Sequence, residues 1–545
     1  MTFPETLRHL KSAIHSSLGN MALGDGNILL ATLIHCLFGL SSHMQLAALN
    51  PISSHVIEFT KKSYNDSYGQ PMSEEVEVWI WSLTSVIFLI GCAVGSLAFG
   101  YVADWLGMRA TLMVVSNLFC IGGSVLQFVA VHLNRFELLI VGRLLVGCAG
   151  GLCLLLSVFL AECSSDKNAA FFGSVVLATP QFLVAFGTLF NLPFLLGTEQ
   201  LWSYSFLLPA APALLHLCFS LYLKRSPKHL YITLGRQELA EKAFRFYQGN
   251  GADWRRQKEE YEAEKLLKVQ SRTEHRHATF MQMMRNPHLR WPLILCTTAS
   301  VAAAFGGTDI ANLYSTQILS HFWELPGAAS GNGTHEIPKG ELSTNPESET
   351  TSTLFTVLAL QFPSAFMGAC VVFFRAMDRF GRRPVYLFGM GCGIAATTSL
   401  FLAGFEPVSA LSTLFAALGL ILAQFSIYVG PDFVIGVLPA ELAPQTSRAL
   451  TGGISWSSHW VSNLVITLGY HPLSEWIGSY AVLPLTAGGV AAFLFLYYTL
   501  PETKGTTVDQ IAQRWRGSTA PIVEEGNCER KPSDARIGHV KVERY

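Results

Sequence analysis

Long apolar runs recur along the whole chain, and they constrain its fold more than any other feature. Each is near or above the ~20 residues that an α-helix needs to cross a bilayer, and only 14% of the 545 residues are charged, against about a quarter in a typical soluble domain. We therefore predict an all-α, polytopic membrane protein with about twelve transmembrane helices. The runs cover residues 28–50, 80–102, 111–132, 138–161, 171–195, 202–223, 291–319, 353–376, 384–404, 410–440, 449–471 and 479–500.

Polar segments between the runs orient and divide the chain. Segment 51–79 is net acidic, whereas segment 224–290 is rich in Lys and Arg, and basic loops tend to stay in the cytoplasm. Segment 322–352 is rich in Gly, Ser, Thr and Glu and is expected to form an outer loop. Both termini are then cytoplasmic. The expected organisation is a cytoplasmic N-terminus (1–27), a six-helix bundle (28–223), a cytoplasmic linker with short helices (224–290), a second six-helix bundle (291–500) and a cytoplasmic tail (501–545).

Two glycosylation sequons agree with this orientation. Asn65 and Asn332 each begin an Asn-x-Ser/Thr triplet, and both lie in segments that the predicted topology places outside. A glycosylated outer face favours the plasma membrane as the location.

The two halves of the chain echo each other. Asp104–Arg109 (DWLGMR) follows the second run and Asp378–Arg383 (DRFGRR) follows the eighth, with Asp, Gly and Arg at the same spacing. Such a duplication predicts two pseudo-symmetric six-helix bundles.

Several motifs together identify a resemblance. The chain resembles the major facilitator superfamily and, within it, the sugar porter or facilitative glucose transporter family, of which it looks like a divergent member. The resemblance implies transport by alternating access between the bundles. It rests on Gly142-Arg143, Glu162, Ser226-Pro227-Lys228, Tyr314-Ser315-Thr316, DRFGRR, Gly430-Pro431, Ala440-Glu441-Leu442, Arg448 and PETKG at 501–505.

Charged residues at the inner ends of the spans form a candidate gating network. The resemblance implies that they pair when the cavity faces outward and separate as it opens inward; alternatively, they anchor helix ends among headgroups. The N-terminal half departs from the family at Trp105, Met108, Phe172 and Arg225, which predicts a weaker latch there. The network comprises Asp104, Arg109, Glu162, Asp378, Arg382, Arg383, Glu441, Arg448 and Glu502.

The substrate positions of the family are only partly retained. Gln181 matches a sugar-contacting glutamine, and Trp460, Ser462 and Asn463 keep the pattern of the eleventh span. Other family amides and a tryptophan are replaced, which predicts a transporter fold with an altered ligand site. The replacements are Ala303, Ala304, Asp309, Phe366, Gly436 and His459.

Asp309 and Asp432 are the most informative of the candidate substrate-binding residues. An ionisable group inside a span costs about 2.5–3.5 kcal/mol on insertion scales and is a functional candidate by default. Alternatively, either Asp lies at an aqueous mouth or bonds to a Ser or Thr without a specific role. His459 is a third candidate, because its imidazole can titrate or donate to a substrate.

Three functions remain open at this point. The first is a facilitative carrier of a hexose or related polyol, the second a carrier of another solute, cationic or proton-coupled through Asp309 and Asp432, and the third a non-transporting sensor. No phosphate-cradling loop, zinc ligand set or nucleophile elbow occurs, so we expect no enzyme, metal or cofactor. The expected partners are a small-molecule substrate and the bilayer, without nucleic acid; a monomer suffices for transport, and the sequence leaves the oligomeric state open.

Overall fold

The computed structural model describes residues 27–274, 280–323, 354–373, 379–404, 410–444, 447–506 and 510–511, and within them it is helical without strands. The first half contains α2 (Ile28–Ile34), the π-turn η1 (His35–Gly39), the 3₁₀-turn η2 (Ser41–Gln45), α3 (Ser53–Tyr68), α4 (Glu74–Leu106), α5 (Met108–Ala110), η3 (Thr111–Val115), α6 (Ser116–His132), α7 (Phe136–Gly150), α8 (Cys153–Cys163), α9 (Asp166–Phe190), η4 (Trp202–Leu207) and α10 (Ala210–Phe219).

The second half follows a helical linker. The linker contains η5 (His229–Thr233), α11 (Gln237–Gln248), α12 (Trp254–Glu274) and α13 (Phe280–Arg285). The second half contains α14 (Pro287–Ala304), α15 (Thr308–Trp323), η6 (Thr356–Gln361), α17 (Phe362–Phe373), α19 (Arg382–Ala403), α20 (Ala410–Tyr428), α21 (Pro431–Leu442), α22 (Arg448–Ile477), η7 (Gly478–Val482) and α23 (Leu483–Thr499).

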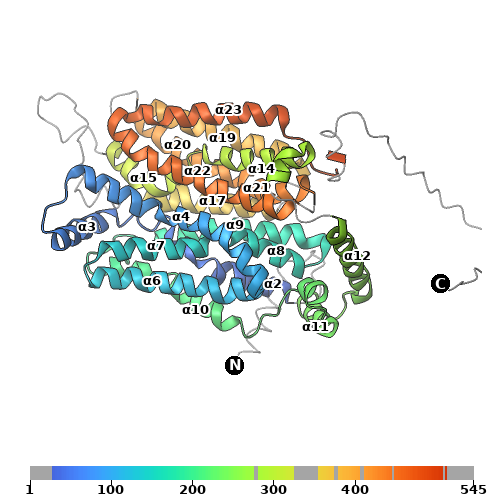
Figure 1. Ribbon diagram of the computed structural model, residues 1–545. Helices are drawn as coiled ribbons and strands as arrows, with labels where there is room; N and C mark the ends of the chain where they lie inside the picture. The colour runs from blue at the N-terminus through green and yellow to red at the C-terminus, as the bar shows by residue number, and fades with distance from the viewer. Residues whose placement is uncertain are drawn as a thin grey trace, which may run out of the picture.

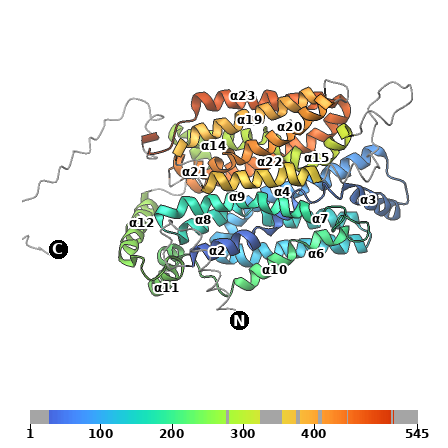
Figure 2. The ribbon, with the colours of Figure 1, turned by 180° about the vertical axis from the view of Figure 1, so that it is seen from behind.

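The two halves lie side by side as two layers of roughly parallel helices. Figures 1 and 2 show α2–α10 in one layer and α14–α23 in the other, with α4 and α9 facing α22 and α17. Helices α11 and α12 lie at one end of the layers and α3 at the other. We call these the linker end and the α3 end.

The apolar spans correspond to helices. Ten helical stretches of the described residues are long and apolar enough to cross a membrane. The predicted eighth span corresponds to the shorter apolar stretch Leu358–Val372, and the eleventh to the 30-residue helix α22. The prediction of a polytopic, all-α membrane protein is confirmed.

Two of the predicted spans are broken inside the membrane. The seventh divides into α14 and α15 at Gly306-Gly307, where Gly307 adopts a φ of 75° that disfavours other residues. The tenth divides into α20 and α21 at Gly430, and Pro431 begins α21. Each break creates a helix N-terminus within the layer, where backbone N–H groups are free to meet other partners.

Glycines bring α4 and α7 into backbone contact. A Cβ added to Gly95 would lie 2.2 Å from the carbonyl oxygen of Cys148, and one added to Gly147 would lie 2.2 Å from that of Phe88. Gly91 and Gly151 are equally close to the facing helix. The two helices therefore pack through reciprocal glycine pairs four residues apart, as small residues allow in membranes.

The duplicated loop motif repeats its backbone conformation. Gly107 precedes α5 with φ 88° and ψ 144°, and Gly381 precedes α19 with φ 94° and ψ 165°. Both values lie in a region that favours glycine, so the two halves share the conformation of this loop as well as its sequence.

Candidate functional site

A cavity of about 60 Å³ lies between the two halves. This volume holds a few water molecules, whereas pockets occupied by small ligands measure roughly 300–1,000 Å³. The halves must therefore move apart before a solute of hexose size can enter. The lining residues are His43, Leu46, Cys153, Leu177, Pro180 and Val184 from the first half, and Ala303, Thr308, Asp309, Ile427, Tyr428, Asp432, Trp456, His459, Trp460 and Asn463 from the second.

Both intramembrane carboxylates face this cavity from broken helices. Asp309 lies in the first turn of α15 and Asp432 in the first turn of α21. Burial disfavours a charged carboxylate, while the positive end of the helix dipole offsets part of that penalty. Asn312 donates to Asp309 Oδ1 at 3.4 Å, and neither Lys nor Arg lines the cavity.

His459 is held in one orientation by two hydrogen bonds. Its Nδ1 lies 3.2 Å from the Ser300 carbonyl oxygen, which can only accept, so Nδ1 carries a proton. Its Nε2 lies 3.1 Å from Asn463 Nδ2 and accepts from that amide. These contacts define a neutral imidazole with its proton on Nδ1.

Gln181 reaches across to the second half instead of lining the cavity. It is fully buried on α9 and donates from Nε2 to Gln361 Oε1 at 2.6 Å and to Ser364 Oγ at 2.8 Å. Gln361 and Gln424 in turn donate to Asn312 Oδ1, at 3.0 and 2.5 Å. We call Gln181, Asn312, Gln361 and Gln424 the amide network.

The sequence alone did not identify three members of the amide network. The family amide positions hold residues such as Asp309 and Phe366, whereas Asn312, Gln361 and Gln424 stand at other positions. Phe366 itself is 67% exposed on the outer surface of α17, away from the cavity. The signal that would have found the three is their polarity inside apolar spans, since intramembrane polar groups face the bundle interior.

A second contact between the halves lies toward the α3 end. Asn50 follows η2 and donates to Ser315 Oγ at 2.9 Å and to the Asn312 carbonyl at 3.4 Å. Residues of α15 therefore bind both Asn50 and the amide network, and these contacts join the halves on this side of the cavity.

Gly436 stands where the family has a tryptophan, and a side chain of the first half occupies the space beside it. A Cβ on Gly436 of α21 would lie 2.6 Å from Leu177 Cδ1 of α9. The side chain of Leu177 occupies the space beside Gly436 and lines the cavity, which narrows it from the first half.

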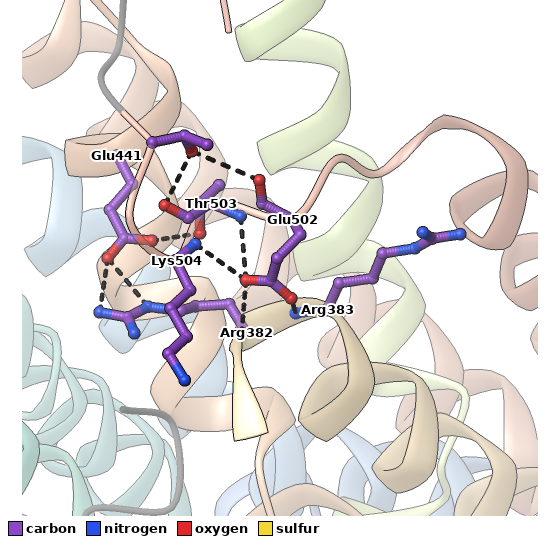
Figure 3. Close-up of polar contacts among 7 residues, drawn as sticks. Arg382, Arg383, Glu441, Glu502, Thr503 and Lys504 are labelled. Atoms are coloured by element: carbon purple, nitrogen blue, oxygen red, sulfur yellow. Dashed lines mark hydrogen bonds and ion pairs between the residues drawn. The ribbon is translucent and has the colours of Figure 1, made fainter. Parts of the chain in front are cut away.

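The linker end of the second half carries a dense charged cluster (Figure 3). Glu502 of the PETKG motif accepts from the backbone N–H groups of Arg382 at 3.0 Å and Arg383 at 3.2 Å, which open α19. Arg382 also forms an ion pair with Glu441 of α21 at 2.9 Å, and Thr503 donates to Glu441. PETKG and DRFGRR are thus parts of one contact, in which a carboxylate caps a helix N-terminus.

Three of the remaining gating candidates each make a hydrogen bond within their own half. Arg109 donates to the carbonyl of Ser220, and Glu162 accepts from Ser226 Oγ at 2.7 Å, so the two contact the same segment after α10. Arg448 donates to the Ala443 carbonyl at 3.4 Å. The side chain of Asp104, and the whole of Asp378, lie outside the described residues.

The structure describes the asparagine of only one of the two sequons. Asn65 is exposed on α3, at the end opposite the linker helices. Asn332 lies outside the described residues.

Two helical layers of this length, with broken helices around a cavity at their interface, define a multi-pass membrane carrier fold of the major facilitator type. The profile of the sugar (and other) transporter family matches residues 28–322 and 350–515. The chain belongs to this family.

Individual relatives agree over most of their length. Human "solute carrier family 2, facilitated glucose transporter member 9" is 25% identical over 494 residues, covering 90% of this chain and 86% of the relative. Chicken (Gallus gallus) member 1 is 26% identical over 469 residues, covering 84% and 87%. The inward-open xylose transporter XylE from E. coli is similar in fold, with a TM-score of 0.65, 20% identity and coverage of 90% of this chain and 100% of XylE.

Proposed function

We propose that this protein is a facilitative carrier of a neutral hexose or related polyol, which it moves across a membrane by alternating access. The observation that carries the proposal is the polar cavity between the two halves of a sugar transporter family member. Besides the carboxylates of Asp309 and Asp432, uncharged donors and acceptors line an otherwise apolar space, which suits a solute that exchanges water for hydrogen bonds at each hydroxyl.

The residues of the site take separate roles in this proposal. Asn463 and His459 meet the solute directly, with Asp309 and Asp432 as acceptors for its hydroxyl groups. Gln181 exchanges its bonds to Gln361 and Ser364 for bonds to the solute when the halves separate. Loss of these bonds and of the Asn50 contact opens the α3 end.

The linker-end charges act as the opposite gate. In the outward-facing state, Arg109 and Glu162 of the first half and Arg382, Glu441 and Glu502 of the second would approach one another. Arg382 and Glu441, two charges of this gate, already form an ion pair within the second half.

We further propose the setting in which transport occurs. The linker and both termini lie in the cytoplasm, and α3 with the Asn65 sequon faces outward at the plasma membrane. A monomer suffices for transport, which needs no enzymatic activity, cofactor or nucleic acid.

Uptake of radiolabelled glucose into proteoliposomes tests the function. We expect saturable uptake that unlabelled glucose competes and that an imposed pH gradient leaves unchanged. Uptake that requires the gradient would replace facilitated with proton-coupled transport. Glucose binding without flux, by correctly inserted protein, would instead identify a sensor.

A further inference from the structure

We propose that the cavity prefers a solute that carries a protonated amine on a hydroxylated body, with the ammonium group held between Asp309 and Asp432. The inference rests on the proposed function in one respect, since it takes this cavity as the transport site. The preferred substrate class is then an amino sugar or amino polyol instead of a neutral sugar.

The charge balance of the cavity is the first support. Asp309 and Asp432 line it together and are close enough to interact electrostatically. The lining includes no Lys or Arg, and neither carboxylate has an ion-pair partner among the described residues. Two carboxylates that repel each other in a site of low polarity are each relieved by a cation placed between them.

The imidazoles of the cavity do not supply that cation. His459 is fixed as a neutral tautomer by Ser300 and Asn463. His43 Nδ1 lies 3.1 Å from the Leu40 carbonyl, a contact within its own turn. The proposal therefore assigns the positive charge to the solute.

The aromatic walls are an independent support. Tyr428, Trp456 and Trp460 line the cavity, and the two indole rings lie at 85° to each other with centroids 6.4 Å apart. Faces of Trp and Tyr attract alkylammonium groups through the negative face of the ring. A carboxylate pair beside aromatic faces is the chemistry that recognises an organic cation.

Unpartnered donors point to hydroxyl groups on the same solute. Trp456 and Trp460 are 4% and 7% exposed, and neither indole N–H has a hydrogen-bond partner among the described residues. A buried N–H without an acceptor is rare in proteins, and a hydroxyl oxygen brought by a ligand would satisfy it. The solute therefore offers acceptors as well as a cation.

Uptake selectivity in proteoliposomes of the full chain tests the proposal. The probes are D-glucosamine, at a pH where its amine is protonated, D-glucose, and N-acetyl-D-glucosamine, which keeps the ring but lacks the charge. We expect the kcat/KM ratio of glucosamine to glucose to be about tenfold or more, because a charge-assisted contact is added. N-acetylglucosamine should not share this advantage.

Neutral variants connect the selectivity to the two carboxylates. Asp309→Asn and Asp432→Asn should each lower the glucosamine-to-glucose ratio about tenfold. Glu75→Gln is the matched control, since Glu75 is an exposed carboxylate in the first turn of α4, and its ratio should equal that of the unchanged protein. A ratio near one in the unchanged protein overturns the proposal, as does a ratio that both Asp variants leave intact.

Two further outcomes separate this inference from the proposed function. Where neither sugar is taken up, the proposed function fails, and equilibrium binding of glucosamine, followed by tryptophan fluorescence, decides the inference alone. Binding that both Asp variants weaken supports it, and absence of binding overturns it. Glucose uptake driven by a pH gradient that the Asp variants abolish, with no change in the ratio, assigns the carboxylates to protons and overturns it as well.

Discussion

Arg143 is a fully buried arginine that holds three elements of the first half together. Its Nε donates to the Thr84 carbonyl at 2.9 Å, and its two terminal nitrogens lie 3.4 and 3.5 Å from the carbonyls of Gln45 and Ser85. The guanidinium also lies over the ring of Phe88, 6.0 Å from its centroid. Carbonyl oxygens and an aromatic face thus take the place of an acidic partner, which the planar fork of Arg makes possible.

Replacing Arg143 by Lys should destabilise the protein although the charge is kept. An ammonium group cannot reach the carbonyls of α4 and of η2 together, and each lost hydrogen bond to a charged group is worth about 1.5–3 kcal/mol. We expect an apparent melting temperature several degrees lower for the detergent-purified protein. Arg255→Lys is the control, since Arg255 is 90% exposed on α12 and should melt unchanged. Equal melting of the two variants would contradict this account of Arg143.

For individual residues, the sequence predicted which side chains line the cavity better than it predicted their hydrogen-bond partners. The cavity positions of Asp309, Asp432, His459 and Asn463 follow from polarity within apolar spans. Glu502 was expected to pair with basic side chains, yet it accepts mainly from backbone N–H groups. That outcome depends on how the chain turns after α23, which no local pattern of residues specifies.

In the loop before α19, Gly381 both adopts a backbone conformation that favours glycine and leaves room for the side chain of Glu502. Gly381 adopts a φ of 94°, and a Cβ there would lie 2.6 Å from Glu502 Oε2. Gly107 occupies the same place in the first half with a φ of 88°, but a Cβ there would meet only His229 at 3.8 Å. The backbone requirement is duplicated, whereas the carboxylate cap belongs to the second half alone in the described residues.

Alanine at these two glycines should therefore have unequal effects. Both substitutions strain the backbone by about 1–3 kcal/mol, because φ near 90° with an extended ψ is a region that residues other than glycine rarely adopt. Gly381→Ala should in addition displace Glu502 and lower the melting temperature further than Gly107→Ala. In a double-mutant cycle with Glu502→Ala, the Gly381 variant should be less than additive and the Gly107 variant additive. Additivity of both pairs would show that Glu502 does not depend on Gly381.

The glycine contact between α4 and α7 allows a test in which one glycine-to-alanine substitution should destabilise the protein and another, outside the contact, should stabilise it. Gly147→Ala places a methyl group against the Phe88 carbonyl, and overpacking of this kind costs about 1–3 kcal/mol. Gly122→Ala on α6 meets nothing within 4 Å and gains up to about 1 kcal/mol from helix propensity. Thermal unfolding of both variants should show a lower melting temperature for the Gly147 variant and an equal or higher one for the Gly122 variant. A stabilised Gly147 variant would mean that the two helices separate easily.

For the molecule as a whole, the contacts that join the halves differ from those that hold each half together. Asn50 and Gln181 reach the second half through neutral hydrogen bonds. By contrast, the Lys61–Glu77 ion pair lies within the first half and the Arg382–Glu441 ion pair within the second. Neutral bonds are individually weak, about 0.5–1.5 kcal/mol, which suits contacts that must break in every cycle.

Asn50→Ala should shift the balance toward separation at the α3 end. Loss of about 1 kcal/mol corresponds to a roughly fivefold change in the population ratio. Pulsed electron resonance between spin labels at Lys62 and Tyr480, exposed near this end of the two halves, should show more of the longer distance. Asn191→Ala is the control, because it removes a 3.1 Å bond to the Ala48 carbonyl within the first half. An unchanged distribution in the Asn50 variant would assign closure to other contacts.

The sequence predicted the number and order of the spans because hydropathy is a local property. Gly430-Pro431 indicated a break and Gly306-Gly307 a loosened helix, but such pairs also occur in continuous membrane helices, so the sequence did not establish that each span divides into two helices. Nor could it predict that Gln181 bonds to Gln361, because that pairing depends on the rotation of α9 and α17 about their axes. Packing between helices, rather than any single helix, determines it.

Helix α22 has a consequence for biosynthesis. It is 30 residues long, yet it is not among the stretches of the described chain that are apolar enough to span by themselves, since it carries cavity and packing residues such as Ser455, His459 and Asn463. A translocon releases segments into lipid according to their own hydrophobicity, and these side chains count against release. Ser455 and His459 have their partners on α14, where Ser300 and the Cys296 carbonyl bond Ser455 and the Ser300 carbonyl accepts from His459. The ribosome completes α14 well before α22, so the newly made helix finds its polar partners already in the membrane. We therefore expect the eleventh span to depend on an earlier one for its insertion.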